Sequence, residues 1–143
     1  MLLIGIDPGA TTGYATWDAT EKRLAVVTSM KIHHAMQHVQ RAWLDGKLHT
    51  LVIEDARLRV WFGSKGAEAL QGAGSIKRDC TIWADFLADL GCPVLSLKPQ
   101  AGATKWTAER FRQATGWAER TNEHARDAAM LVYQRAVIGT GRR

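Results

Sequence analysis

The fold of this chain is set by its first strand, the stretch Leu2-Leu3-Ile4-Gly5-Ile6-Asp7-Pro8-Gly9. A short apolar run that ends in an acid and a Pro-Gly turn is typical of a buried β-strand. Two more strands are predicted over 13–18 and 23–29, with short polar connections between them. Three successive strands with short connections predict an antiparallel meander.

The rest of the chain alternates helical and strand patterns. Apolar residues recur at helical spacing over 31–44, and strand chemistry returns over 48–55. The further elements that we expect are a helix over 75–90 after a loop, a strand over 93–97, and helices over 104–114 and 121–138. This order predicts an α/β fold: a mixed five-stranded sheet of strand order 3-2-1-4-5, strands 1–3 antiparallel, with helices on both faces.

Length and composition bound the class of protein. A chain of 143 residues, 46% of them hydrophobic, suits one compact domain spanning 1–143. Its apolar runs fall short of the ~20 residues of a membrane span, so we expect a cytoplasmic protein with no membrane partner. The formal net charge of +5 favours a polyanionic partner such as nucleic acid.

Four residues that can carry chemistry are expected to converge at one edge of the sheet. Asp7 ends the first strand, and Glu54 lies near the end of the fourth, which neighbours the first in this topology. His124 and Asp127 are three apart on one face of the last helix. Because strand alternation sends Glu54 and Asp55 to opposite faces, only one of them can lie close to Asp7.

Each of these residues alone has an ordinary structural explanation. An acid after a strand often caps a turn, and a His and an Asp three apart on a helix are usually solvated or salt-bridged. Together, however, three acids at one site would repel one another, and two divalent cations would offset that repulsion. Oxygen ligands with one imidazole suit Mg²⁺ or Mn²⁺, and two such ions can cleave a phosphodiester. The set Asp7, Glu54, His124 and Asp127 therefore predicts a metal-dependent nuclease.

Three stretches of the chain resemble the RuvC family of Holliday-junction resolvases. They are Ile4-Gly5-Ile6-Asp7-Pro8-Gly9 with Thr12-Gly13-Tyr14-Ala15, then Leu51-Val52-Ile53-Glu54, and Asn122-Glu123-His124-Ala125-Arg126-Asp127-Ala128. The resemblance implies an RNase H-like fold and endonuclease activity on branched DNA such as four-way junctions. It also implies two ions of Mg²⁺ or Mn²⁺ held by Asp7, Glu54, His124 and Asp127, and a homodimer whose two-fold axis supplies two sites.

The resemblance also implies a lysine that approaches the cleaved phosphate. Lys105 fits that pattern best, and Lys98 competes with it. The turn between Asp7 and Thr12 is one residue shorter than in many bacterial members, and the chain is compact. Both features look like the phage-encoded branch, which implies the cytoplasm of a bacterium or of a phage-infected host.

Basic and aromatic residues after the fourth strand form a second group. We interpret them as a nucleic-acid-binding segment that follows phosphates, with an aromatic pair that wedges or stacks at the branch point. The aromatic pair could equally anchor the loop to the core or pack across a dimer interface. The residues are Arg57, Arg59, Trp61, Phe62, Lys65, Lys77 and Arg78, with Lys98 from a later loop.

Three other functions compete. A YqgF-like nuclease that processes structured RNA shares the fold, the size and the Asp-Pro-Gly turn, although the spacing of His124 and Asp127 fits the resolvases better. A binding module would hold junctions without cutting them. A sugar-kinase type of phosphotransferase also begins with an Asp-x-Gly turn, but it needs two such domains around its nucleotide, and the length argues against it.

Overall fold

The protein is built on one five-stranded mixed sheet, seen in a computed structural model that describes residues 1–58, 67–99 and 105–140. The strand order is β3-β2-β1-β4-β5. The first three strands pair antiparallel, whereas β4 runs parallel to β1 and β5 parallel to β4. The predicted order and directions are confirmed. The strands are β1 (Leu2–Asp7), β2 (Thr11–Asp18), β3 (Arg23–Lys31), β4 (Leu48–Glu54) and β5 (Val94–Leu97).

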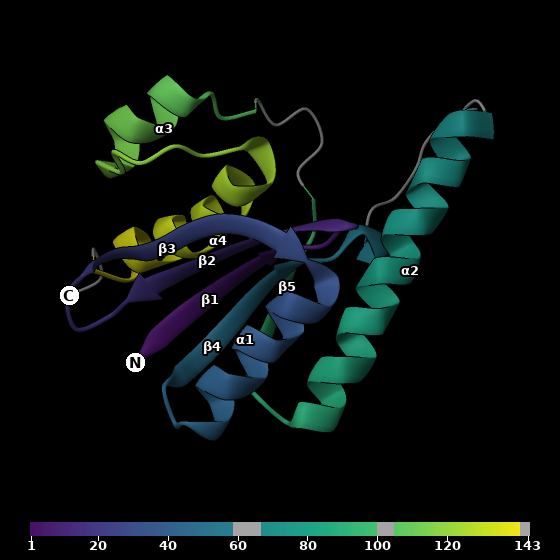
Figure 1. Ribbon diagram of the computed structural model, residues 1–143, viewed down its shortest axis with the longest axis horizontal. Coiled ribbons are helices and arrows are strands. Elements are labelled where there is room, and N and C mark those ends of the chain that lie inside the picture. The colour runs from purple at the N-terminus through teal and green to yellow at the C-terminus, as the bar shows by residue number, and fades with distance from the viewer. Residues whose placement is uncertain (59–66, 100–104, 141–143) are drawn as a thin grey trace.

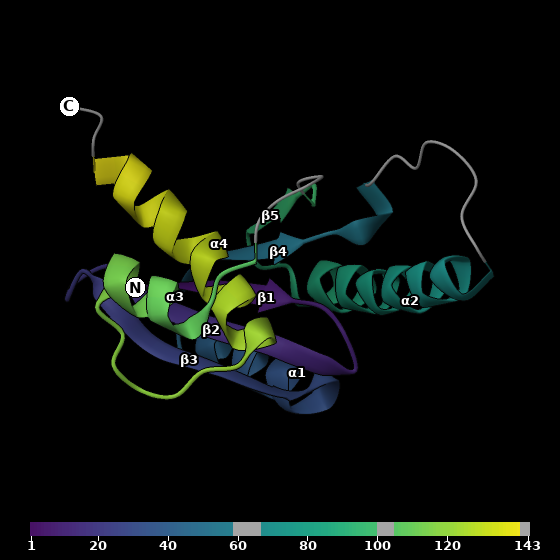
Figure 2. The same cartoon turned by 90° about the horizontal axis from the view of Figure 1, so that it is seen from above.

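Helices cover both faces of the sheet, as predicted. In Figures 1 and 2, α1 and α4 lie on opposite sides of the strands, α3 lies beside α4, and part of α2 projects past the sheet. Among the described residues, no helix combines the length and apolar character needed to cross a membrane. The helices are α1 (Ile32–Leu44), α2 (Ala67–Leu90), α3 (Ala108–Thr115) and α4 (Glu123–Thr140), with a 3-10 turn η1 (Ala56–Leu58).

Helices α1 and α4 begin within two residues of the expected positions, whereas α2 and α3 begin farther away. Helix α2 begins at Ala67 rather than at Ser75, because Gly72 and Gly74 are accommodated inside it. A glycine costs a helix only about 1 kcal/mol relative to alanine, which a long helix tolerates. Helix α3 begins at Ala108 rather than at 104, because the Thr107 side chain caps it by accepting a hydrogen bond from the Arg110 amide (3.1 Å).

The two hydrophobic clusters show which face each strand residue points to. Ile4 and Ile6 of β1 pack with α1 and α2, together with Ile53 of β4. Val52 of β4 packs on the other face with residues of α4 such as Val132. Because side chains alternate along a strand, Asp7 and Glu54 face α4, and Asp55 faces the α1 and α2 side.

Helix α4 lies unusually close to β1 and β2. A Cβ added at Gly5 would collide with the carbonyl oxygen of Ala128, and one added at Gly13 would collide with the carbonyl oxygen of His124. Small residues on the helix face the sheet as well, among them Ala125 and Ala128, both almost fully buried. The absence of side chains at the two glycines therefore lets the first turns of α4 rest directly on the strands.

Candidate active site

The carboxyl ends of β1 and β4 and the first turn of α4 meet around Asp7. Ile6 pairs with Ile53, so that Asp7 and Glu54 are the next residues of adjacent strands. On its other side Asp7 pairs with Gly13, the residue on which the His124 backbone rests. The His124 ring nitrogen Nδ1 lies 3.4 Å from Asp7 Oδ2.

The carboxyl group of Asp7 is largely buried and lies near two other acids. Burial is the largest cause that raises the pKa of Asp7 to about 7, and the negative charges of Asp127 and Glu54 add to it. The hydrogen bond and charge of His124 act in the opposite direction. The structure thus brings together Asp7, Glu54, His124 and Asp127, the four residues expected at this edge.

The donors of this cluster fit a hard divalent cation. Three carboxylates supply oxygen ligands, which Mg²⁺ and Mn²⁺ prefer, and a cation would relieve the repulsion that raises the Asp7 pKa. No three His, Cys, Asp or Glu side chains in the described part of the chain are already arranged to hold a metal ion.

A lysine ammonium borders the cluster. Lys105 Nζ lies 2.6 Å from Glu123 Oε1 and 3.3 Å from Asp127 Oδ2. The hydrogen bond to Glu123 is the main cause that raises the pKa of Lys105, and the same bond lowers the pKa of Glu123. Of the two lysines proposed from the sequence, Lys105 thus contacts an acid of the cluster, whereas Lys98 is exposed just after β5.

Two contributors at this edge were not identified from the sequence. Glu123 stands four residues before Asp127, a spacing that puts both acids on one face of α4, and this was the signal that could have paired it with Lys105. Thr12 is fully buried and its hydroxyl donates to the Gly9 carbonyl (2.8 Å), which fixes the turn after Asp7. An ordinary threonine offers no such signal in the sequence.

Asp55 points away from the cluster and binds Arg57. Its carboxylate accepts hydrogen bonds from the Arg57 backbone amide (2.9 Å), from Nε (3.0 Å) and from Nη2 (2.7 Å). Asp55 is 5% exposed, and these hydrogen bonds keep its pKa below the ordinary value of 3.8. The guanidinium that was expected to bind nucleic acid is thus held by a carboxylate in this structure.

Asp55→Asn is expected to destabilise the fold by about 1–3 kcal/mol at pH 7, since it weakens charge-assisted hydrogen bonds to Arg57. Because the folded-state pKa of Asp55 is lowered, its stabilising effect is full above the unfolded-state pKa and is lost as pH falls through the folded-state value. The free energy of unfolding of the variant should therefore lie well below that of the wild type at pH 7, and the difference should shrink toward pH 3. Denaturant unfolding at both pH values measures it.

The exposed Asp89→Asn on α2 is the matched control for that experiment, with little change expected. An equal deficit of Asp55→Asn at pH 7 and pH 3 would contradict the pairing.

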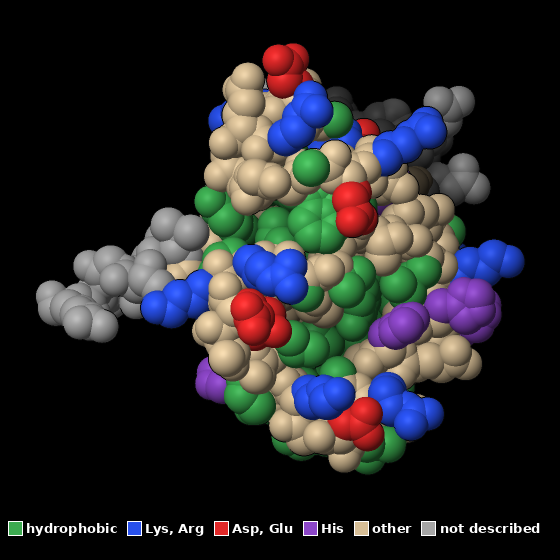
Figure 3. Space-filling view, turned by 60° about the vertical axis from the view of Figure 1, so that its left-hand side comes forward, with side chains coloured by type: hydrophobic (Ala, Val, Ile, Leu, Met, Phe, Trp, Pro, Cys, Tyr) green, Lys and Arg blue, Asp and Glu red, His purple; other side chains and the backbone are tan. Residues whose placement is uncertain are grey.

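The other predicted nucleic-acid contacts are only partly described. Arg59, Trp61, Phe62 and Lys65 lie outside the described residues. On α2, Lys77 is half-buried and Arg78 is exposed. In the face shown in Figure 3, acidic and basic side chains alternate around an apolar centre, so the net positive charge is not concentrated there.

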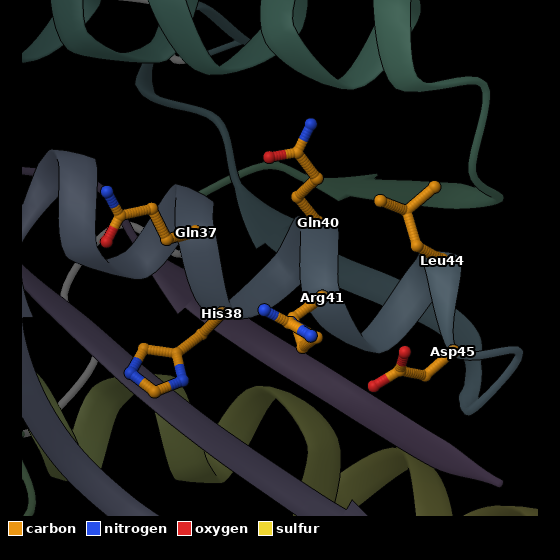
Figure 4. A pocket seen from close by; sticks show the side chains of 6 residues that line it. All are labelled: Gln37, His38, Gln40, Arg41, Leu44 and Asp45. Atoms are coloured by element: carbon orange, nitrogen blue, oxygen red, sulfur yellow. The ribbon is translucent and has the colours of Figure 1, made fainter.

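Two of the hollows that the described residues line lie on the opposite side of the sheet from α4. One, of about 340 Å³, lies between β4, β5 and α2 and includes Asp55, Arg57 and the buried thiols of Cys80 and Cys92. The other, of about 730 Å³, runs along α1 (Figure 4). Neither of these two hollows contains a residue of the Asp7 cluster.

Comparisons with known proteins bear on the fold. No protein-family model and no curated protein sequence matches the chain. Among solved structures, it resembles "T. thermophilus RuvC in complex with Holliday junction substrate" with a TM-score of 0.61. The two chains are 19% identical over 99% of this chain and 96% of the other. The protein thus has a RuvC-like, RNase H-like fold, as the sequence resemblance implied.

Proposed function

We propose that the protein is a divalent-metal-dependent endonuclease that cleaves branched DNA as a Holliday junction resolvase. The observation that carries the proposal is the convergence of Asp7, Glu54 and Asp127 beside His124, in a site where the pKa of Asp7 is raised by burial and by its neighbours' charges. Carboxylates forced together in this way are typical of functional sites rather than of turn caps. The likeness to a RuvC bound to a Holliday junction supports the choice of DNA substrate.

Asp7, Glu54, His124 and Asp127 would hold two ions of Mg²⁺ or Mn²⁺. When bound, such ions supply activation of a water molecule and stabilisation of the leaving oxygen. Lys105, whose side chain is 68% exposed, can present its ammonium to a phosphate oxygen from the open side. Glu123 and Asp127 orient that ammonium, and the contact of His124 Nδ1 with Asp7 orients the imidazole ring.

A symmetry argument and the exposed side chains of α2 support a homodimer. A four-way junction nicked symmetrically needs two sites related by a two-fold axis. Part of α2 projects past the sheet (Figure 1), and Ile76 and Ile82 of the same helix are each 44% accessible. Apolar side chains that are exposed on a helix can contact a second copy of the chain.

Three finer assignments rest on the sequence alone. We propose that residues 1–143 form one catalytic domain, that it works in the cytoplasm, and that it belongs to the phage-encoded branch of resolvases. The short turn between Asp7 and Thr12 supports the last of these.

The test is a cleavage assay with three labelled substrates: a four-way DNA junction, a linear duplex with the sequence of its arms, and an RNA hairpin. We expect paired nicks at the junction with Mg²⁺ or Mn²⁺ and none in EDTA, because the carboxylates need the ions to act. The linear duplex should remain intact. Denaturing gels of strands labelled one at a time locate the nicks.

Other outcomes of the same assay would overturn the proposal. Cleavage of the RNA hairpin alone would indicate a YqgF-like nuclease. Tight junction binding without cleavage under any ion would indicate a binding module.

A further inference from the structure

Arg126 on α4 joins two segments that flank α3. Its Nε donates to the Trp106 carbonyl oxygen (2.7 Å), just before α3. Its Nη1 donates to the carbonyl oxygen (3.1 Å) and the hydroxyl (3.0 Å) of Thr121, after α3. The half-buried guanidinium of Arg126 thus links the chain just before α3 to the chain after α3.

The middle of the segment 106–121, which contains α3, is attached to the rest of the protein by other contacts. Phe111 of α3 is 1% exposed and packs in the α4-side core. Tyr133 Oη donates to the Ala114 carbonyl oxygen (2.8 Å) at the end of α3. Arg126 therefore holds the beginning of this segment, at Trp106, which is the residue next to Lys105.

Three side chains of α4 contact residues 105 and 106, two at a side chain and one at the backbone. Glu123 and Asp127 contact the ammonium of Lys105. Arg126 holds the backbone of the next residue. Positions i, i+3 and i+4 of a helix share one face. A single face of α4 therefore contacts both the side chain of Lys105 and the main chain of Trp106.

The main-chain anchor matters because Lys105 is long and exposed. Ordering a lysine side chain costs up to about 2 kcal/mol in rotamer entropy, so a displaced backbone would leave two surface ion pairs too weak to keep its ammonium in place. A planar guanidinium can donate to separate acceptors at fixed angles, which a lysine ammonium at position 126 would not reproduce.

We propose that Arg126 is a positioning residue for Lys105, which fixes the backbone at Trp106 so that the Lys105 ammonium stays at the Asp127 edge of the site. This inference rests on the proposed function, in which Lys105 meets the cleaved phosphate.

The activity test is a double-mutant cycle of Arg126→Met and Lys105→Met, measured as single-turnover cleavage of the four-way junction at saturating DNA. Arg126→Met should lower the rate constant about tenfold, the scale seen when partners that orient site groups are removed. The dissociation constant for DNA should stay within about twofold, because the site's phosphate-facing charge is retained. The double variant should cleave no more slowly than Lys105→Met alone.

The second measurement does not depend on cleavage. Backbone ¹⁵N order parameters at residues 105 and 106 should fall in Arg126→Met from about 0.85 toward 0.6, the range of flexible backbone. They should be unchanged in Arg135→Met, an exposed arginine farther along α4. Arg126→Lys keeps the charge and, if Arg126→Met fails to fold, replaces it in both measurements with a smaller change expected.

The outcomes separate the two proposals. The role of Arg126 would be overturned if the two substitutions lowered the cleavage rate constant independently, so that their effects multiplied in the double variant. Unchanged order parameters at residues 105 and 106 would overturn it as well. If the wild type cleaves no substrate, the proposed function fails, and the order parameters alone decide whether Arg126 fixes the segment.

Discussion

Asp7→Asn is expected to abolish cleavage of four-way DNA while leaving DNA binding within severalfold. Asp7 stands between Glu54 on the adjacent strand and His124 on α4, so its carboxylate adjoins both sides of the site. Asparagine keeps the shape but cannot supply the charge that a divalent cation needs. Loss of partners that merely orient metal ligands costs 10- to 100-fold, so losing this ligand should cost about a hundredfold or more. Single-turnover rates and binding titrations measure the two effects.

The same substitution should stabilise the metal-free protein. Because the folded-state pKa of Asp7 is raised from 3.8 to about 7, the wild type loses stability as pH rises through that interval, and the loss is complete above it. The neutral asparagine avoids this loss, which is of the order of a few kcal/mol. The melting temperature of Asp7→Asn in EDTA should exceed that of the wild type at pH 8 and approach it at pH 4.

Asp45→Asn, at an exposed acid just after α1, should change neither cleavage nor stability. Full activity of Asp7→Asn would exclude the proposed metal site. A variant that is inactive but less stable than the wild type at pH 8 would instead mean that Asp7 has a structural role.

The sheet could be predicted from the sequence because its signals are local. The apolar run before Asp7 and the return of strand chemistry before Glu54 define the two central strands, and handedness rules leave few ways to connect them. The period of two then places Glu54 and Asp55 on opposite faces. The expected convergence of Asp7 with Glu54 needed no further information.

The fine placement of the site could not be predicted, because it depends on contacts distant in sequence. Arg126 binds Trp106 across 20 positions, and Lys105 reaches Asp127 across 22. No periodic pattern reports such pairs. The pairing of Arg57 with Asp55 is local by contrast, but a basic residue in a basic segment suggested a phosphate partner first.

The close approach of α4 to the sheet gives the second large effect: Gly13→Ala should destabilise the protein and strongly slow cleavage. The added Cβ would collide with the His124 carbonyl oxygen and would lie 3.0 Å from the Cβ of Asp7. Backbone atoms cannot rotate away, so the first turn of α4 must move. Overpacking of this kind costs typically 1–3 kcal/mol, and a misplacement of about 1 Å in a reacting group can cost about a hundredfold in rate.

Two other glycines separate loss of packing from loss of site geometry. Gly5→Ala meets the Ala128 carbonyl oxygen one turn farther along α4, so it should destabilise similarly but slow cleavage less. Gly74→Ala, inside α2 with no atom within 4 Å of the added Cβ, should stabilise by up to about 1 kcal/mol and leave cleavage unchanged. Denaturant unfolding and single-turnover cleavage of the three variants test this ordering. A Gly13→Ala protein as stable and active as the wild type would mean that α4 can withdraw from the sheet without disturbing His124 and Asp127, and the glycine would then have no part in assembling the site.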